Sequence, residues 1–172
     1  EGGEINQIDY VVTTLKNNPN SRRILFHGWN VEYLPDESMS PHENVENGKM
    51  ALPPCHVLCQ FYIIEDKISA QLYQRSGDIG LGIPFNIASY SFLLHIIGKI
   101  TGYTPRYFIH TLGDTHIYEN HIEAVNEQLT RVPSCFPKIN VSNITDINHI
   151  KESDFEILDY NYYPTIKAEM IA

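Results

Sequence analysis

Apolar and polar residues follow two periods along the chain, one typical of helices and one typical of strands. Apolar residues recur at helical spacing in three segments, residues 6–16, 85–100 and 121–129. Short apolar runs that are typical of strands occupy residues 22–31, 57–64, 68–73, 106–112, 139–141 and 155–160. This mixture predicts an α/β (α+β) fold in which helices flank one mixed β-sheet.

The strands predicted at 57–64 and 68–73 are separated by so few residues that we expect a β-hairpin. If the hairpin pivots near Glu65, facing residues have numbers that sum to about 130, and Cys55 then faces Arg75. Opposed residues in an antiparallel pair have Cβ atoms roughly 5 Å apart. A guanidinium at that distance favours the thiolate over the thiol, which is the form that a nucleophilic cysteine needs.

The cysteines differ in their sequence surroundings. A free cysteine is more often an inert buried residue than a nucleophile, but Cys55 follows two prolines and faces Arg75, whereas Cys59 lies within an apolar strand and is expected to pack in the core. A zinc site at Cys55, His56 and Cys59 would lack a second pair of ligands, so we expect no metal. The three cysteines show no disulfide framework spacing, which favours a reduced, cytoplasmic setting.

The composition indicates one folded domain over residues 1–172. Hydrophobic residues make up 42% of the sequence and aromatic residues 11%, which fits a packed core rather than a disordered chain. The formal charge of −9 argues against a general nucleic-acid surface or an anionic membrane as partner. No apolar run approaches the roughly 20 residues that span a bilayer, and no signal peptide is visible.

An anionic substrate would need a local basic pocket in so acidic a protein, and Arg22, Arg23 and Arg75 could form one. Because the guanidinium fork matches phosphate oxygens, the Arg22-Arg23 pair is either a phosphate clamp or an exposed charge pair. Residues 35–48 are acidic and poor in large apolar side chains. We expect them to form a solvated surface loop.

Further polar candidates lie near the glycine-rich segment 77–82. This segment lacks the P-loop lysine and the dinucleotide-binding spacing, so we expect its glycines to let the backbone approach a ligand closely. Asn86 offers a donor and an acceptor, which suits a base edge with an N–H beside a carbonyl; it could also cap the following helix, and the two roles need not exclude each other. On an extended segment His116 and Tyr118 would point the same way, toward one ligand hydroxyl.

Several of these segments together, in order along essentially the whole chain, resemble the thymidylate synthase family. The matching segments are Ser21-Arg22-Arg23, Trp29-Asn30, Met50-Ala51-Leu52-Pro53-Pro54-Cys55-His56, Gln74-Arg75-Ser76-Gly77-Asp78, Gly80-Leu81-Gly82-Ile83-Pro84-Phe85-Asn86-Ile87-Ala88-Ser89-Tyr90, Leu112-Gly113-Asp114-Thr115-His116-Ile117-Tyr118 and Pro164-Thr165-Ile166-Lys167-Ala168-Glu169-Met170. The resemblance implies a thymidylate synthase-like fold and activity.

That activity would be the reductive methylation of deoxyuridylate (dUMP) to dTMP, with 5,10-methylenetetrahydrofolate as co-substrate and dihydrofolate as product. By resemblance, Cys55 would be the thiolate that adds to C6 of uracil, and Arg75 and Asn86 would be the other catalytic residues. The implied dUMP-binding residues are Arg22, Arg23, Arg75, Ser76, Gly77, Asp78, Asn86, His116, Ile117 and Tyr118. The implied folate-binding residues are Asp78, Gly82, Ile171 and Ala172, and no metal is implied.

The resemblance also implies a homodimer packed sheet against sheet, in which Arg22 and Arg23 reach the phosphate in the partner subunit's site. The C-terminal residues would fold over the bound dUMP and folate as a lid. The ending Ile171-Ala172 departs from the more usual one in the family, and the loop at 35–48 is longer than in many relatives. Neither a membrane nor a nucleic acid is implied as a partner.

The chain begins at Glu1 without an initiating methionine, and the N-terminal third of the family, which supplies a glutamate for proton transfer, has no counterpart in it. We therefore expect a C-terminal catalytic portion whose full-length parent is active and which is inactive alone. Two alternatives stay open, a deoxyuridylate hydroxymethylase and a truncated, non-catalytic nucleotide-binding paralogue. Asn86 argues for uracil over cytosine, but it does not distinguish a methyl from a hydroxymethyl product.

Overall fold

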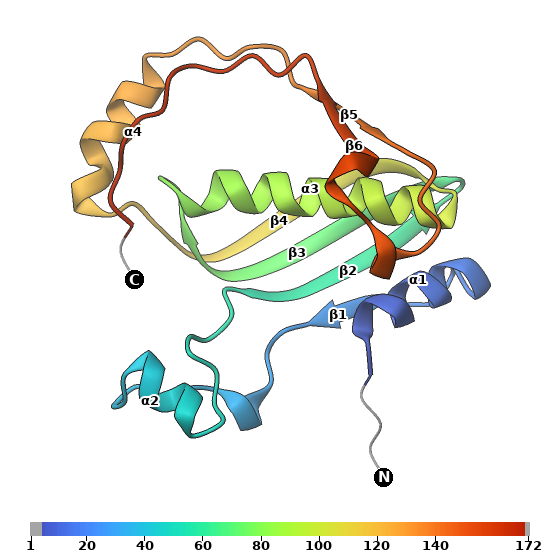
Figure 1. The fold of residues 1–172 in the computed structure, drawn as a ribbon, viewed down its shortest axis with the longest axis horizontal. Coiled ribbons are helices and arrows are strands. Elements are labelled where there is room, and N and C mark those ends of the chain that lie inside the picture. Colours follow the sequence, from blue (N-terminus) through green and yellow to red (C-terminus); the bar gives the residue numbers. More distant parts are fainter. Residues whose placement is uncertain (1–4, 171–172) are drawn as a thin grey trace.

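A computed structural model describes residues 5–170 of the chain (Figure 1). Its centre is a four-stranded sheet in the order β1-β2-β3-β4. These strands are β1 (Leu25–His27), β2 (His56–Ile64), β3 (Lys67–Asp78) and β4 (Thr104–His116). The pairs β1–β2 and β2–β3 are antiparallel, and β3–β4 is parallel. The predicted mixed sheet is therefore confirmed.

The described residues contain four helices, three of which were predicted from the apolar periodicity. They are α1 (Gln7–Asn17), α2 (Pro41–Glu46), α3 (Gly82–Thr101) and α4 (Ile122–Leu129), with short 3₁₀ turns at Val31–Tyr33, Glu119–His121, Ile147–His149 and Glu152–Asp154. The helix α3 forms the crossover that parallel strands β3 and β4 require. It ends where Gly102 adopts a left-handed conformation with φ of 82°, so the predicted glycine stop is confirmed.

One face of the sheet carries the main core. Apolar side chains of β2 and β3 on this face pack against α1 and α3, and the buried residues are Val11, Leu15, Ile24, Cys59, Phe61, Ile68, Ala70, Leu72, Leu94 and Ile97. The opposite face has no covering element among residues 5–170 (Figure 1). It exposes large side chains from three adjacent strands, Tyr62, Ile64, Tyr73, Tyr107 and Ile109.

Two short strands lie apart from the main sheet, so the prediction of a single sheet is wrong. The strands β5 (Lys138–Val141) and β6 (Phe155–Leu158) pair only with each other, in antiparallel fashion. Their apolar side chains pack on the C-terminal half of α3, where the rings of Phe92 and Phe155 have centroids 4.6 Å apart. Packing on this helix, rather than pairing with a sheet edge, therefore fixes their position.

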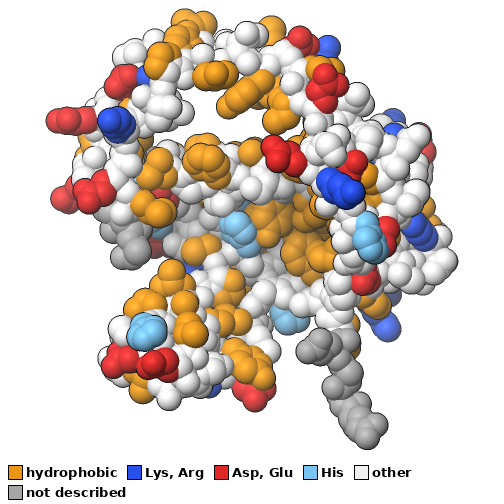
Figure 2. All heavy atoms as spheres, in the orientation of Figure 1, with side chains coloured by type: hydrophobic (Ala, Val, Ile, Leu, Met, Phe, Trp, Pro, Cys, Tyr) orange, Lys and Arg blue, Asp and Glu red, His pale blue; other side chains and the backbone are white. Residues whose placement is uncertain are grey.

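Helix α3 is covered on its sheet side and partly open on its other side. It is long and apolar enough to cross a membrane by length and composition, as core helices of soluble proteins also are, so the expectation that no apolar segment reaches that length does not hold. Figure 2 shows the molecule hollowed beside α3. Two stretches of chain arch over this hollow: the connection from α4 to β5, and the C-terminal segment (residues 159–170) that follows β6. Phe92, Ile139 and Ile157 help to line a groove of about 560 Å³ there.

Two predicted segments differ in detail. The strand expected at 22–31 is limited to β1, because the Asn30 side chain accepts a hydrogen bond from the Glu32 amide and starts a 3₁₀ turn. The segment 35–48 is mostly exposed, as expected of a surface loop, but it contains α2, whose first turn is closed by a capping box between Ser40 and Glu43. The buried Asn44 amide fastens this segment through two hydrogen bonds to the Asp36 backbone, at 2.7 and 3.0 Å.

Candidate active site

Cys55 and Arg75 lie opposite each other at the open end of the β2–β3 hairpin. Along most of the hairpin, paired residues sum to 131, as in Leu58 with Tyr73, but an irregularity at Val57 shifts the next pair to His56 with Gln74. The ladder therefore ends with the Arg75 amide donating to the Cys55 carbonyl at 2.9 Å. The predicted pairing is confirmed, and a β-bulge produces it.

The Arg75 guanidinium is fixed beside the Cys55 sulfur by the backbone of the two preceding prolines. Arg75 Nε donates to the Pro54 carbonyl at 3.0 Å, and Nη2 donates to the Pro53 carbonyl at 2.9 Å. The same Nη2 lies 3.8 Å from Cys55 Sγ, and the group stacks over the Trp29 ring at 5.6 Å. Among residues 5–170, Nη1 has no partner, so its two N–H groups can donate to an anion.

Cys59 shows what the same side chain does in the core. It lies four residues further along β2, is completely buried, and has a thiol pKa raised to about 12 because burial disfavours the charged thiolate. Cys55 is exposed. The predicted division between a packing cysteine and an accessible one is confirmed.

The ends of β3 and β4 extend the site, because both strands continue further than predicted. Their parallel pairing places Ser76 beside Asp114, Gly77 beside Thr115 and Asp78 beside His116. Gly77 lies close under the Ile83 side chain, since a Cβ there would be 2.9 Å from Ile83 Cδ1. Residues 76–78 and 114–116 are thereby held at one edge of the sheet, at the same end as Cys55.

Asp78 joins the end of β3 to the start of α3. Its carboxylate accepts backbone hydrogen bonds from Gly80, Leu81 and Gly82, at 2.9, 3.1 and 3.2 Å. These amides would otherwise lack partners at the helix N-terminus, and the negative charge suits that end of the helix dipole. Asp78 thus caps α3, which begins three residues earlier than the predicted Phe85.

His116 and Tyr118 lie together, as expected from their spacing. Their rings meet edge to face with centroids 5.1 Å apart. His116 Nδ1 lies 2.8 Å from Asp114 Oδ1, which orients the imidazole and leaves Nε2 for another partner. Ile117, between them, is exposed.

Asn86 is held by a buried polar network and does not cap α3, so the capping alternative is wrong. It lies in the second turn of the helix, where Asn86 Oδ1 accepts from Gln74 Nε2 at 3.0 Å. Gln74 is 2% exposed; its Nε2 also donates to the Ser76 carbonyl at 2.8 Å, and His110 Nε2 lies 2.9 Å from its Oε1. Burial, and secondarily the charge of His56, lowers the pKa of His110.

Arg22 and Arg23 are not brought to this cluster by their own chain. Both are exposed and lie beside β2 near Phe61, whose amide donates to the Ile24 carbonyl at 2.8 Å. Phe61 lies six positions along the chain from Cys55, a distance of roughly 20 Å in an extended strand. An arginine side chain cannot cover that distance.

The predicted folate contacts Ile171 and Ala172 lie outside the described residues. Sequence reasoning missed Gln74, His110 and His121, which are partly or fully buried polar groups around the site. Gln74 could have been found from the sequence, since it continues the core-facing positions Ala70 and Leu72 of an alternating strand.

Within residues 5–170, no group of three or more His, Cys, Asp or Glu side chains could hold a metal.

Comparison with known proteins gives one consistent result. The family model described as thymidylate synthase matches residues 1–172. The chain is 52% identical to a thymidylate synthase of Pseudomonas fluorescens (strain SBW25) over 99% of this chain and 62% of the relative. It is 50% identical to a Homo sapiens thymidylate synthase over 98% of this chain and 50% of the relative. A Human herpesvirus 8 type P relative of the same name is 46% identical, over 98% and 47% respectively. The chain thus spans between about half and three fifths of the length of these relatives.

Proposed function

The chain belongs to the thymidylate synthase family, and we propose that the full-length protein catalyses the reductive methylation of dUMP to dTMP. The observation that carries this proposal is the exposed Cys55 thiol beside the fixed Arg75 guanidinium, with Nη2 and Sγ 3.8 Å apart. The polar groups that a nucleotide requires lie at the same end of the sheet. The co-substrate, 5,10-methylenetetrahydrofolate, would supply the one-carbon unit and the reducing hydride and leave as dihydrofolate.

Cys55 is the nucleophile in this reaction. Carbon 5 of uracil is a weak nucleophile, but addition of the Cys55 thiolate to C6 forms an S–C6 bond and moves the C5–C6 electron pair toward C5 and O4. Asn86 can donate to O4 through its amide N–H groups and accept from N3–H through Oδ1. Gln74, which already donates to Oδ1 at 3.0 Å, holds the amide in that orientation. The electron pair at C5 would then form a bond to the one-carbon unit of the folate, the C5 proton would leave to a base, and the folate nitrogen would depart. Hydride transfer from the folate to the new exocyclic carbon would then break the S–C6 bond and release the Cys55 thiolate.

The phosphate of dUMP binds at Arg75. Nη1 presents two N–H groups, while Nε and Nη2 are held by the proline carbonyls, so the charged group stays beside the sulfur when the nucleotide binds. Ser76 adds a hydroxyl next to Arg75, and the backbone of Gly77 and Asp78 follows it. His116, oriented by Asp114, and Tyr118 hold the ribose hydroxyl, with Ile117 between them.

Arg22 and Arg23 complete the phosphate site from a second copy of the chain. Their position near Phe61, about six strand residues from Cys55, excludes a contribution within the same subunit. The uncovered sheet face gives the two copies an apolar surface on which to pack, through Tyr62, Tyr107 and Ile109. We propose a homodimer with sheet packed on sheet, in which each site uses both chains.

The folate binds beside Asp78 and the start of α3. Phe85 is 72% exposed at this position and offers an aromatic face for a planar ring. The Asp78 carboxylate and the Gly82 backbone add polar contacts, and Ile171 and Ala172 contribute from the C-terminal end. We place the protein in the cytoplasm, in keeping with its free thiols.

The test uses the full-length protein with 5-fluoro-dUMP and methylenetetrahydrofolate. We expect a covalent adduct at Cys55, identified by peptide mass spectrometry, and dTMP as the product from dUMP. A hydroxymethyl product would assign the protein to the hydroxymethylase alternative, and the absence of any adduct would favour the non-catalytic paralogue. Residues 1–172 assayed alone should give no turnover. Full turnover would show that activity does not require the part of the relatives that this chain does not cover.

Subunit mixing tests the shared site. Cys55→Ser dimers and Arg22→Ala/Arg23→Ala dimers should each be nearly inactive. Hybrids contain one site with Cys55 from one chain and both arginines from the other, so mixing should restore a substantial part of the activity. No recovery in hybrids whose formation is verified by native mass spectrometry would show that the arginines do not act across the interface.

A further inference from the structure

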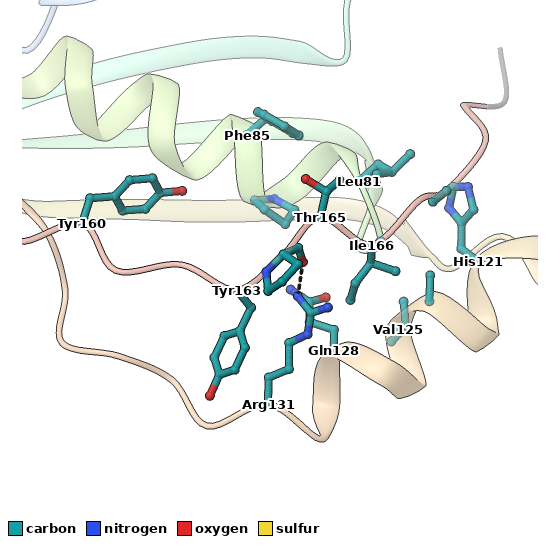
Figure 3. A pocket seen from close by; sticks show the side chains of 15 residues that line it. Leu81, Phe85, His121, Val125, Gln128, Arg131, Tyr160, Tyr163, Thr165 and Ile166 are labelled. Atoms are coloured by element: carbon teal, nitrogen blue, oxygen red, sulfur yellow. Dashed lines mark hydrogen bonds between the residues drawn. The ribbon is translucent and has the colours of Figure 1, made fainter.

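His121 is a buried histidine that the proposed reaction does not use. It ends the 3₁₀ turn before α4 and is 1% exposed. His121 Nε2 lies 2.6 Å from the Glu169 carbonyl, and because a carbonyl only accepts, Nε2 carries the hydrogen. Nδ1 has no hydrogen-bond partner among residues 5–170 and faces Asp78 Oδ1 at 3.9 Å. The ring thus lies between the C-terminal segment and the loop that begins at Asp78 (Figure 3).

Gly80 allows this close approach. A Cβ added at Gly80 would lie 3.1 Å from His121 Nδ1 and 3.3 Å from Asp78 Oδ1. The ring is supported on another side by Tyr118, with centroids 5.6 Å apart in an edge-to-face arrangement. His121 therefore contacts two parts of the proposed nucleotide and folate site without reaching a reacting atom.

Among residues 5–170, hydrogen bonds attach the C-terminal segment to the region of α4 at two points. At one, Arg131 Nη1 donates to the Pro164 carbonyl at 2.7 Å, and the guanidinium lies over the Tyr163 ring at 5.3 Å. At the other, His121 binds the Glu169 carbonyl. Between these points the segment borders a cavity of about 340 Å³ that Leu81 and Phe85 also line (Figure 3). The His121 attachment also reaches Asp78, since Nδ1 lies 3.9 Å from Asp78 Oδ1.

We propose that His121 is a positioning residue that sets the distance between the C-terminal segment and the Asp78–Gly82 loop, and so the width of the folate-binding side of the site. The inference rests on the proposed function, since Asp78, Gly82 and the C-terminal residues are its folate contacts. The Nε2–H group holds the segment by hydrogen bonding, and the ring supports the loop by packing. The nucleotide phosphate lies at Arg75, away from His121, and the ring borders the dUMP site only at Tyr118 and Asp78, so we expect dUMP binding to depend on this contact less than folate binding does.

Two substitutions separate the hydrogen bond from the bulk of the ring. In His121→Gln the side-chain amide nitrogen can take the place of Nε2 and still donate to Glu169, whereas in His121→Asn the shorter amide occupies the Nδ1 position and cannot. In the full-length protein, we expect His121→Asn to raise the KM for methylenetetrahydrofolate by about tenfold, in line with one lost hydrogen bond. The Kd for dUMP should rise by a smaller factor than the folate KM, since the packing beside Tyr118 is lost only in part, and His121→Gln should recover most of the loss.

Hydrogen exchange provides a readout that does not depend on activity. Amides of residues 165–170 should exchange faster in His121→Asn than in the wild type and His121→Gln, while Arg131→Gln should speed exchange nearer Tyr163 with a smaller effect on the folate KM. Equal behaviour of the Asn and Gln variants, or unchanged exchange, would overturn the proposal. If His121→Asn does not fold, Gly80→Ala must speed exchange at residues 165–170 as well as raise the folate KM, because its methyl group would crowd the ring at 3.1 Å from His121 Nδ1. A wild-type protein that forms no dTMP would refute the proposed function, and the exchange data would still decide whether His121 holds the segment.

Discussion

The middle and the open end of the β2–β3 hairpin contain the same kind of side chain in opposite environments. In the middle of the hairpin, Cys59 pairs in a regular ladder, is fully buried, and has a pKa raised to about 12. At the open end, past the irregularity at Val57, Cys55 is exposed and lies 3.8 Å from Arg75 Nη2. Strand register and neighbouring side chains thus bury one cysteine and expose another only four positions away.

The difference depends on how each region satisfies its polar groups. The middle of the hairpin pairs backbone with backbone and packs apolar side chains against α3. At the open end, the Pro53 and Pro54 carbonyls accept from the Arg75 side chain instead. This exchange of partners fixes a charged group beside a thiol while leaving both accessible.

Replacing each cysteine separately should give opposite results. We expect Cys55→Ser to lower kcat by at least about 1000-fold, because the nucleophile is lost, with little change in thermal stability. Cys59→Ala should retain activity but lower the free energy of unfolding by about 1–2 kcal/mol, since it leaves a small cavity in the core. Steady-state assays and urea unfolding measure the two effects. An active Cys55→Ser enzyme would exclude covalent catalysis by this residue.

Arg75→Lys tests whether the guanidinium fork, rather than a positive charge alone, makes Cys55 effective. A lysine keeps the charge but cannot bind both proline carbonyls and still offer two N–H groups to a phosphate. We expect kcat/KM for dUMP to fall by roughly 100-fold. The matched control is Arg106→Lys on β4, an exposed arginine outside the site, which should change kcat/KM less than about twofold. A near-normal Arg75→Lys enzyme would show that charge alone suffices.

Local periodicity predicted much of the fold. The hairpin, α1 and the extent of α3 follow from apolar spacing and the Gly102 stop. The separate β5–β6 sheet was not predictable in this way, because it depends on packing between Phe92 and Phe155, far apart in the sequence. The length of β4 was missed for a similar reason. Its last residues are polar and are held as a strand by pairing with β3.

The site was predicted unevenly. The facing of Cys55 and Arg75 followed from counting residues about Glu65, although the count is correct at this end only because of the bulge at Val57. The resemblance pointed to residues that contact a nucleotide, but not to side chains that orient those residues. His121 gave no signal, since its burial depends on the Glu169 carbonyl, 48 positions later.

Gln74→Leu tests whether the buried hydrogen bonds of Gln74 to Asn86 and His110 stabilise the open end of the hairpin. The substitution leaves Asn86 Oδ1 and His110 Nε2 without their buried partner. We expect the free energy of unfolding to fall by about 1–3 kcal/mol, and the KM for dUMP to rise because Asn86 is no longer oriented. Gln128→Leu on exposed α4 is the control for stability and should stay within about 0.5 kcal/mol. Unchanged stability in Gln74→Leu would mean that the network contributes nothing.

The smallest effect concerns the pH dependence of stability through His110. Its pKa is lowered in the folded protein, mainly by burial, so the unfolded chain binds a proton more readily. The free energy of unfolding should therefore be highest above the ordinary histidine value of 6.5 and decrease as the pH falls through it. In His110→Gln an amide N–H can still donate to Gln74, so part of this decrease should disappear while the network persists. Burial also lowers the pKa of His95, so some pH dependence remains in the variant. Urea unfolding of the wild type and His110→Gln between pH 7.5 and 5.5 measures the difference. If the free energy of unfolding changes equally with pH in both proteins, His110 does not contribute to the pH dependence of stability.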